Sequence, residues 1–213
     1  MGKADNVSGE TVQFDAAATP QALERVAARL RERNIEVTIV SDAQQAREAV
    51  LQRIPAGAEV HAGKSKSLVD IGVTSVLAAE GAYTYLRNIF LKMDRNTQMR
   101  EIRKLISAPD FMLGSVAAIT EDGVLVAASA TASQLGPYAS GAGKLILVVG
   151  SQKVVPDLEA ALRRIREYVL PWEDAQVRPM VPSGSFVGKI LLIEREWVAG
   201  RIEVILVEKP VGM

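Results

Sequence analysis

Five consecutive apolar residues at 145–149, between Lys144 and Gly150, constrain the fold of this chain most strongly. A strand that is apolar at every position is typical of a parallel sheet covered by helices on both faces. A half-exposed antiparallel strand would instead alternate between apolar and polar residues. We therefore expect this run to lie at the centre of an open, mainly parallel α/β sheet.

The first third of the chain supports this architecture. Thr19 and Pro20 begin a helix, and strands are expected at 35–40 and 58–62 with a helix between them. Strand–helix–strand units are overwhelmingly right-handed and usually build parallel sheets. Further elements are expected as follows: helices at 68–79, 89–106 and 156–169, the last ending at Pro171, and strands at 111–120, 124–128, 189–193 and 201–207. The helix at 89–106 has one charged face, which favours solvent exposure, with partner docking as the alternative.

The chain is predicted to form one domain. Residues 1–18 are expected to be a flexible leader and residues 19–213 a single α/β domain. The Pro-, Ser- and Gly-rich stretch at 171–188 is interpreted as a surface excursion followed by strands, and not as a linker between domains. Oligomeric state stays open, with a homo-oligomer among the alternatives.

Composition excludes several classes of protein. The 213 residues are 48% hydrophobic and 23% charged, and 25 Lys and Arg balance 25 Asp and Glu, so no overall charge favours nucleic acid. No apolar run is long enough to span a membrane, and the amino terminus lacks the apolar core of a signal peptide. We expect a cytoplasmic protein with no nucleic-acid partner and no membrane insertion.

The chain has no cysteine and one histidine, His61. Disulfides, thiolate nucleophiles, iron–sulfur ligation and a multi-histidine metal site within this chain are therefore excluded. Neither a metal nor a cofactor is predicted, and any redox chemistry must belong to a partner. His61 ends an apolar strand, where both a structural histidine and a catalytic base remain open.

The turn after the strand at 58–62 has the composition of an anion-binding loop. Gly63, Lys64, Ser65 and Ser67 combine a small residue, a cation and two hydroxyls at the start of a helix. The spacing matches neither a P-loop nor a dinucleotide-binding turn. The candidate ligand is a small anion, and the alternative is a solvated loop whose serine caps a helix.

A second candidate site is the acidic tip of Glu121, Asp122 and Gly123, between the strands at 111–120 and 124–128. If the tip lies at the carboxyl edge of the sheet, it faces the same crevice as the Gly63 turn. Glu121 and Asp122 are then the candidate catalytic carboxylates and Gly123 a ligand-binding position. The alternative is an ordinary hairpin turn.

Four segments in the same order resemble the LUD domain of the lactate-utilisation protein C family. These segments are His61–Gly72, Ala118–Gly123, Val148–Val155 and Gly200–Val207. The resemblance implies a NagB/RpiA/CoA-transferase-like fold with a strand-containing carboxyl-terminal excursion. Gly63, Ser65, Ser67 and the acidic tip are the positions carried over from the family pattern.

The resemblance also implies a function. It points to an accessory subunit of an L-lactate utilisation system that acts with iron–sulfur partner proteins and binds a small anionic ligand. Two alternatives remain: an isomerase- or transferase-like enzyme acting on a phosphorylated or CoA-linked metabolite, and a non-catalytic ligand sensor or scaffold. The chain departs from its relatives at Pro179 and Met180, where many have a cysteine, and at the alanines of 127–132, where relatives often have Asn and Gly.

Overall fold

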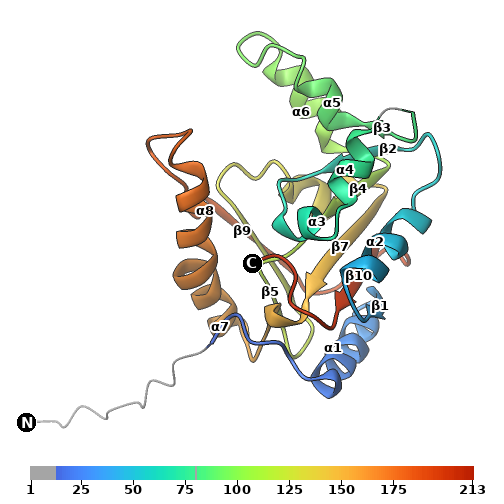
Figure 1. Cartoon of the computed structure of the whole chain (residues 1–213), viewed down its shortest axis with the longest axis vertical. Helices are drawn as coiled ribbons and strands as arrows, with labels where there is room; N and C mark the ends of the chain where they lie inside the picture. The colour runs from blue at the N-terminus through green and yellow to red at the C-terminus, as the bar shows by residue number, and fades with distance from the viewer. Residues whose placement is uncertain (1–12, 80) are drawn as a thin grey trace, which may run out of the picture.

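The centre of the molecule is a six-stranded parallel sheet (Figure 1). The structure is a computed structural model that describes residues 13–79 and 81–213. All five strand pairings are parallel. In spatial order the strands are β1 (Glu36–Val40), β10 (Ile202–Val207), β7 (Lys144–Gly150), β4 (Phe111–Gly114), β2 (Glu59–Ala62) and β3 (Thr84–Tyr85). The prediction for 145–149 is confirmed, because β7 is an interior strand and these five residues are buried.

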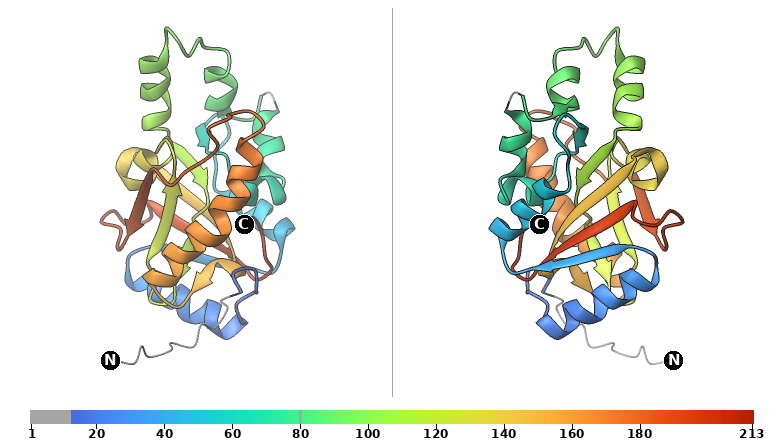
Figure 2. Two further views of the ribbon diagram at one scale, coloured as in Figure 1. Left: turned by 90° about the vertical axis from the view of Figure 1, so that its left-hand side faces the viewer. Right: turned by 90° about the vertical axis from the view of Figure 1, so that its right-hand side faces the viewer.

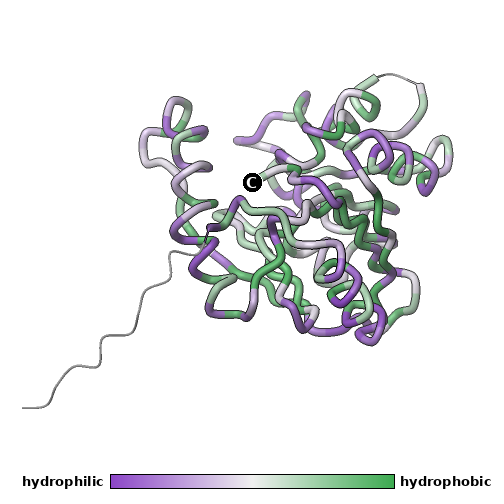
Figure 3. Tube along the Cα trace, turned by 60° about the horizontal axis from the view of Figure 1, so that its bottom comes forward, coloured by the Kyte–Doolittle hydropathy of each residue, from purple (hydrophilic) through white to green (hydrophobic). Residues whose placement is uncertain are grey.

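Helices cover both faces of this sheet. Helix α1 (Pro20–Glu32) packs on one face, where Leu23, Val26 and Leu30 join the core of β7 and β10. The other face is covered by α2 (Ala43–Gln52), α3 (Lys66–Asp70) and α4 (Val73–Ala78). Figure 3 shows apolar segments gathered along the strands and alternating hydropathy along the helices. The open α/β architecture is therefore as expected.

A second, smaller sheet lies beside α1, and the sequence did not predict it. Its strands are β8 (Val154–Val155), β5 (Ala118–Thr120), β6 (Leu125–Ser129) and β9 (Lys189–Ile193), in that order. The strand expected at 111–120 is divided into β4 and β5, so that each half joins a different sheet. A third core lies between this sheet and α7 (Leu158–Arg163), and Figure 2 shows the long helix that begins with α7 on the outer side.

Two expected helices are interrupted. The helix at 68–79 is divided into α3 and α4 by Gly72, whose φ of +74° ends the regular helix. The helix at 89–106 is replaced by α5 (Leu86–Phe90) and α6 (Met99–Ser107), which form the arm at the top of Figure 1. Asp94 accounts for the break, because it accepts hydrogen bonds from Asn96 N and Thr97 Oγ1 and stabilises a turn.

Pro171 does not end the helix that begins after Asp157, which is a correction to the sequence prediction. The helix continues through a π-helical stretch, η3 (Arg164–Val169), into α8 (Leu170–Val177). A π-helical stretch changes the local hydrogen-bond register, so the missing N–H of proline is accommodated there. Residues 171–177 of the predicted excursion are therefore helical. Of the predicted leader, residues 1–12 lie outside the described residues.

Candidate functional site

Four neighbouring strands of the large sheet deliver polar groups to one edge. Strands β10, β7, β4 and β2 are adjacent and parallel, so their carboxyl ends meet. The segments that follow them carry Gly212, Lys153, Ser115 and Ser67 respectively. Open α/β sheets bind ligands at this edge, so these residues define the candidate site.

Lys153 is the central residue of the site. It ends the short 3₁₀ turn η2 (Ser151–Lys153) directly after β7, and its side chain is buried. Its Nζ atom lies 2.9 Å from Ser67 Oγ and 2.9 Å from Ser115 Oγ, and the two hydroxyl oxygens are 3.2 Å apart. We call these three residues the Lys153 cluster.

The amine of Lys153 is held in an environment that disfavours its charge. The pKa of Lys153 is lowered from 10.5 to about 7, mainly by burial and to a smaller extent by the nearby Arg164 cation, while Asp70 opposes the change. Lys153 forms no ion pair in the described part of the chain, since the Asp70 carboxylate pairs with Lys66. Near neutral pH a substantial fraction of Lys153 is therefore the free amine.

The carboxyl-terminal segment covers the cluster. The Val211 carbonyl oxygen accepts hydrogen bonds from Gln152 Nε2 at 3.0 Å and from Ser67 Oγ at 3.4 Å. Gly212 N donates to Asp70 Oδ2 at 2.9 Å, and a Cβ at Gly212 would overlap Ser67 Oγ. Figure 1 shows the end of the chain beside α3. Only glycine fits at position 212 while the segment keeps this path.

Two buried polar atoms beside Lys153 have no hydrogen-bond partner within residues 13–79 and 81–213. They are Ser151 Oγ and Gln152 Oε1, on the same turn as Lys153. Buried polar groups are normally paired, and those that are not commonly mark a position for water or a ligand. The turn after β7 therefore offers more polar groups than the protein itself satisfies.

Tyr138 positions the serine that follows β4. Its hydroxyl donates to Ser115 O at 3.2 Å and accepts from Ser115 N at 3.1 Å. A Cβ at Gly114 would overlap the Tyr138 hydroxyl, so the close approach depends on glycine. This contact fixes the backbone from which the Ser115 side chain reaches Lys153.

The Gly63 turn contributes only one of its predicted residues to the cluster, Ser67. The Ser65 hydroxyl accepts from Leu68 N and caps α3, and the Lys64 ammonium pairs with Glu173 at 3.1 Å. Gly63 N donates to the Leu113 carbonyl oxygen at 3.4 Å. Three of the groups expected to hold an anion therefore have partners within the protein.

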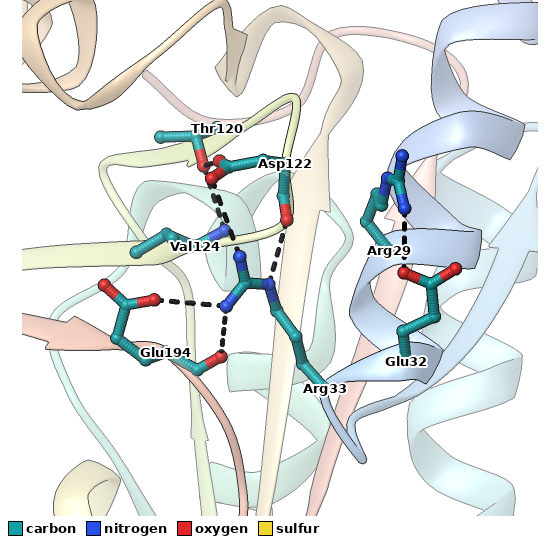
Figure 4. A network of polar contacts seen from close by, with 7 residues as sticks. All are labelled: Arg29, Glu32, Arg33, Thr120, Asp122, Val124 and Glu194. Atoms are coloured by element: carbon teal, nitrogen blue, oxygen red, sulfur yellow. Dashed lines mark hydrogen bonds and ion pairs between the residues drawn. The ribbon is translucent and has the colours of Figure 1, made fainter.

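The acidic tip lies elsewhere. Arg33 donates to the Asp122 carbonyl oxygen at 2.8 Å and pairs with the Asp122 carboxylate at 3.5 Å and with Glu194 at 3.1 Å (Figure 4). Gly123 has a φ of +90° and packs against α1, and Glu121 N continues the pairing with β8. These contacts are those of a structural hairpin turn.

The tip and the Gly63 turn do not share a crevice, contrary to the sequence expectation. Arg33 precedes the amino end of β1, whereas Gly63 follows the carboxyl end of β2. Three strands separate β1 from β2, which corresponds to about 19 Å across the sheet. The expectation assumed that β5 belonged to the large sheet, but β5 pairs with β6 and β8 in the small one.

His61 is a buried histidine that points to a structural role. Its ring packs edge-on against Phe90 with 5.9 Å between ring centroids, and its Nδ1 atom has no hydrogen-bond partner among the residues that the structure describes. Burial, with a smaller contribution from Arg87, lowers the pKa of His61 to about 4. The ring is therefore neutral at physiological pH.

Within residues 13–79 and 81–213, no group of three or more His, Cys, Asp or Glu residues is arranged to hold a metal ion. In the same part of the chain, no helix combines the length and apolarity needed to cross a membrane. The candidate site thus consists of the amine and two hydroxyls of the Lys153 cluster and the neighbouring amide of Gln152. Such groups bind small polar molecules and transfer protons.

Comparisons with known proteins agree with this fold. The family model of the LUD domain matches residues 23–207. A crystal structure of a DUF162 family protein from Deinococcus radiodurans superposes with a TM-score of 0.52 over 88% of this chain and 96% of that chain, at 16% identity, which supports the fold alone. No curated protein matches the chain. Since the family model spans most of the sequence, the chain belongs to the LUD domain family.

Proposed function

We propose that this protein is an accessory subunit of a cytoplasmic L-lactate utilisation system and binds a small carboxylate at the Lys153 cluster. The observation that carries the proposal is a buried lysine that has two serine hydroxyls as partners and forms no ion pair in the described residues. A buried cation without a counter-ion is costly, and a carboxylate ligand removes that cost. The family membership supplies the metabolic context.

Electrons removed from lactate must travel through partner proteins in this proposal. The chain has no cysteine to hold an iron–sulfur cluster and a single buried histidine. We therefore assign electron transfer to iron–sulfur subunits and ligand binding to this chain. The proposal moves the anion site from the Gly63 turn to the Lys153 cluster, with Ser67 common to both.

The first test is a binding titration followed by NMR with L-lactate, pyruvate and inorganic phosphate. We expect saturable binding of a carboxylate by the wild-type protein and at least a tenfold loss of affinity in Lys153→Met. The matched control is Lys64→Met, which removes a lysine whose side chain is 56% exposed and should leave affinity unchanged. Equal binding by all three proteins would contradict the ligand site.

The second test addresses the metabolic role. A strain that lacks this protein should fail to grow on L-lactate, and the wild-type gene should restore growth. Co-purification with the iron–sulfur subunits of the same strain should be retained in Lys153→Met, because the cluster is interior. Normal growth of the deletion strain on L-lactate would refute the accessory role.

A further inference from the structure

We propose that Lys153 is a carbonyl-reactive amine whose Nζ atom forms an imine with a small 2-oxo acid. The inference rests on the proposed function only in placing a small carboxylate at this cluster. The geometry points to it in three ways: the amine forms no ion pair with a carboxylate of the described residues, two hydroxyls flank it, and the neighbouring segment presents a carbonyl oxygen where a carboxylate oxygen would bind.

The first requirement for imine formation is an unprotonated amine. A lysine becomes nucleophilic at neutral pH when it is desolvated or lies near another cation. Lys153 satisfies both conditions, since its side chain is buried and the positive charge of Arg164 disfavours a second cation nearby. The other lysines in the described part of the chain are not buried.

The second requirement is a pair of groups that transfer protons. In the reaction, the Nζ lone pair attacks the ketone carbon, and the carbonyl electron pair moves to oxygen, which takes a proton from a flanking hydroxyl. The nitrogen then loses a proton and the carbinolamine releases water, leaving the C=N bond. Ser67 and Ser115, each 2.9 Å from Nζ, are placed to relay these protons. No electron acceptor is needed, because the step is a condensation.

The third requirement is recognition of the carboxylate. The Val211 carbonyl oxygen accepts from both Gln152 Nε2 and Ser67 Oγ, and Gly212 O accepts from the same amide at 3.2 Å. These donors suit the two oxygens of a carboxylate equally well. A 2-oxo acid would therefore displace Val211 and Gly212, placing its carboxylate on Gln152 and its ketone carbon next to Lys153.

The covering segment explains how the ligand enters. Residues 208–213 contain no helix or strand, and Gly212 is held at its backbone by the Asp70 carboxylate. Displacing Val211 and Gly212 breaks four hydrogen bonds and moves the buried Val211 side chain, and three of these bonds, those from Gln152 and Ser67, are made again to the carboxylate of the ligand. The segment thus excludes water from the amine in the closed state and gives way to a ligand that replaces its carbonyl oxygens.

The experiment is reductive trapping of the full-length protein with pyruvate and borohydride. An imine that is reduced adds about 72 Da, which is pyruvate less water plus two hydrogens. We expect a single adduct, located at Lys153 by peptide mapping, whose rate of formation rises through pH 7. L-Lactate has no ketone and should give none.

Variants make the assignment specific. Lys153→Arg and Lys153→Met should abolish the adduct, whereas Lys64→Arg should leave it unchanged. Scattered labelling of surface lysines, or no adduct in the wild type, would overturn the inference.

The outcome is separable from that of the proposed function. Reversible carboxylate binding that Lys153→Met abolishes, without any trapped adduct, would retain the proposed site and reject the imine. A trapped adduct in a protein whose deletion leaves growth on L-lactate normal would retain the imine and reject the metabolic role.

Discussion

Replacing Lys153 by methionine should make the protein more stable at pH 7, and this gain should disappear at pH 9. Methionine keeps the length and most of the volume of lysine but has no charge to desolvate. In the folded protein the pKa of Lys153 is about 7, against 10.5 for an ordinary lysine. Between these two pH values the unfolded chain binds more protons at this position than the folded one, so stability rises with pH.

The magnitude follows from the size of this pKa difference. At pH 7, protonation of this lysine in the unfolded chain lowers the free energy of unfolding by about 4 kcal/mol, and at pH 9 it lowers it by about 2 kcal/mol. The substitution also removes the two hydrogen bonds to Ser67 and Ser115, worth about 1 kcal/mol each. The net gain is therefore about 2 kcal/mol at pH 7 and close to zero at pH 9.

Urea unfolding at pH 7, 8 and 9, followed by circular dichroism, measures this difference directly. From pH 7 to pH 9, the free energy of unfolding of the wild type should rise by about 2 kcal/mol relative to that of Lys153→Met. Lys64→Met, at an exposed position, should run parallel to the wild type. Parallel curves for the wild type and Lys153→Met would refute the desolvated amine and remove the physical basis of the imine.

Three further predictions concern contacts of the large sheet. Gly114→Ala should destabilise the protein by about 3 kcal/mol in thermal unfolding, because its Cβ would overlap the Tyr138 hydroxyl. The double variant with Tyr138→Phe should recover part of this loss. Full stability of the single variant would contradict the contact. Glu203→Gln should lower the free energy of unfolding by about 3 kcal/mol, since the buried Glu203 carboxylate accepts a hydrogen bond from Arg53 Nε at 2.6 Å and pairs with Lys144. A loss under about 1 kcal/mol would show that these ion pairs are solvated. His61→Phe should reduce acid sensitivity between pH 6.5 and 4, because a neutral buried ring with a pKa of about 4 must gain a proton on unfolding there; an unchanged acid transition would contradict its burial.

The large sheet could be predicted because its signals are local. The apolar run of β7 and the first strand–helix–strand unit each depend on residues close together in sequence, and both interpretations are confirmed. The second sheet could not be predicted in the same way. Strand β9 pairs with β6, which lies 60 to 68 residues earlier in the chain, and nothing local in 189–193 indicates that partner. The acidic tip was expected at the wrong place because the second sheet, to which β5 belongs, was not predicted.

The Lys153 cluster was missed because each of its members looks ordinary in its own segment. The family resemblance included Lys153 and Ser67, but only Ser67 carried a predicted role, and Ser115 carried none. The available signal was positional: each residue follows the carboxyl end of a strand, and ligands bind at that edge in open α/β sheets. Only the order of the strands shows that these residues come together. That order depends on long-range pairings, such as the pairing of β10 with β7.

The glycines at this edge hold information that sequence reasoning left unused. Gly114 precedes Ser115, Gly150 precedes the turn that carries Lys153, and Gly212 covers Ser67. At all three a Cβ would overlap a neighbouring atom of the site, so each marks a close approach of backbone to side chain. Gly150 has an extended backbone with φ of −74°, which any residue adopts, and is therefore required for space rather than for conformation. Of the three, Gly212 lies nearest the buried amine, since a Cβ there would come within 3.1 Å of Lys153 Nζ, whereas Gly114 and Gly150 make room for Tyr138, Gln152 and Val211 around the Lys153 cluster. The close packing of backbone on this cluster therefore depends on small residues on three different segments.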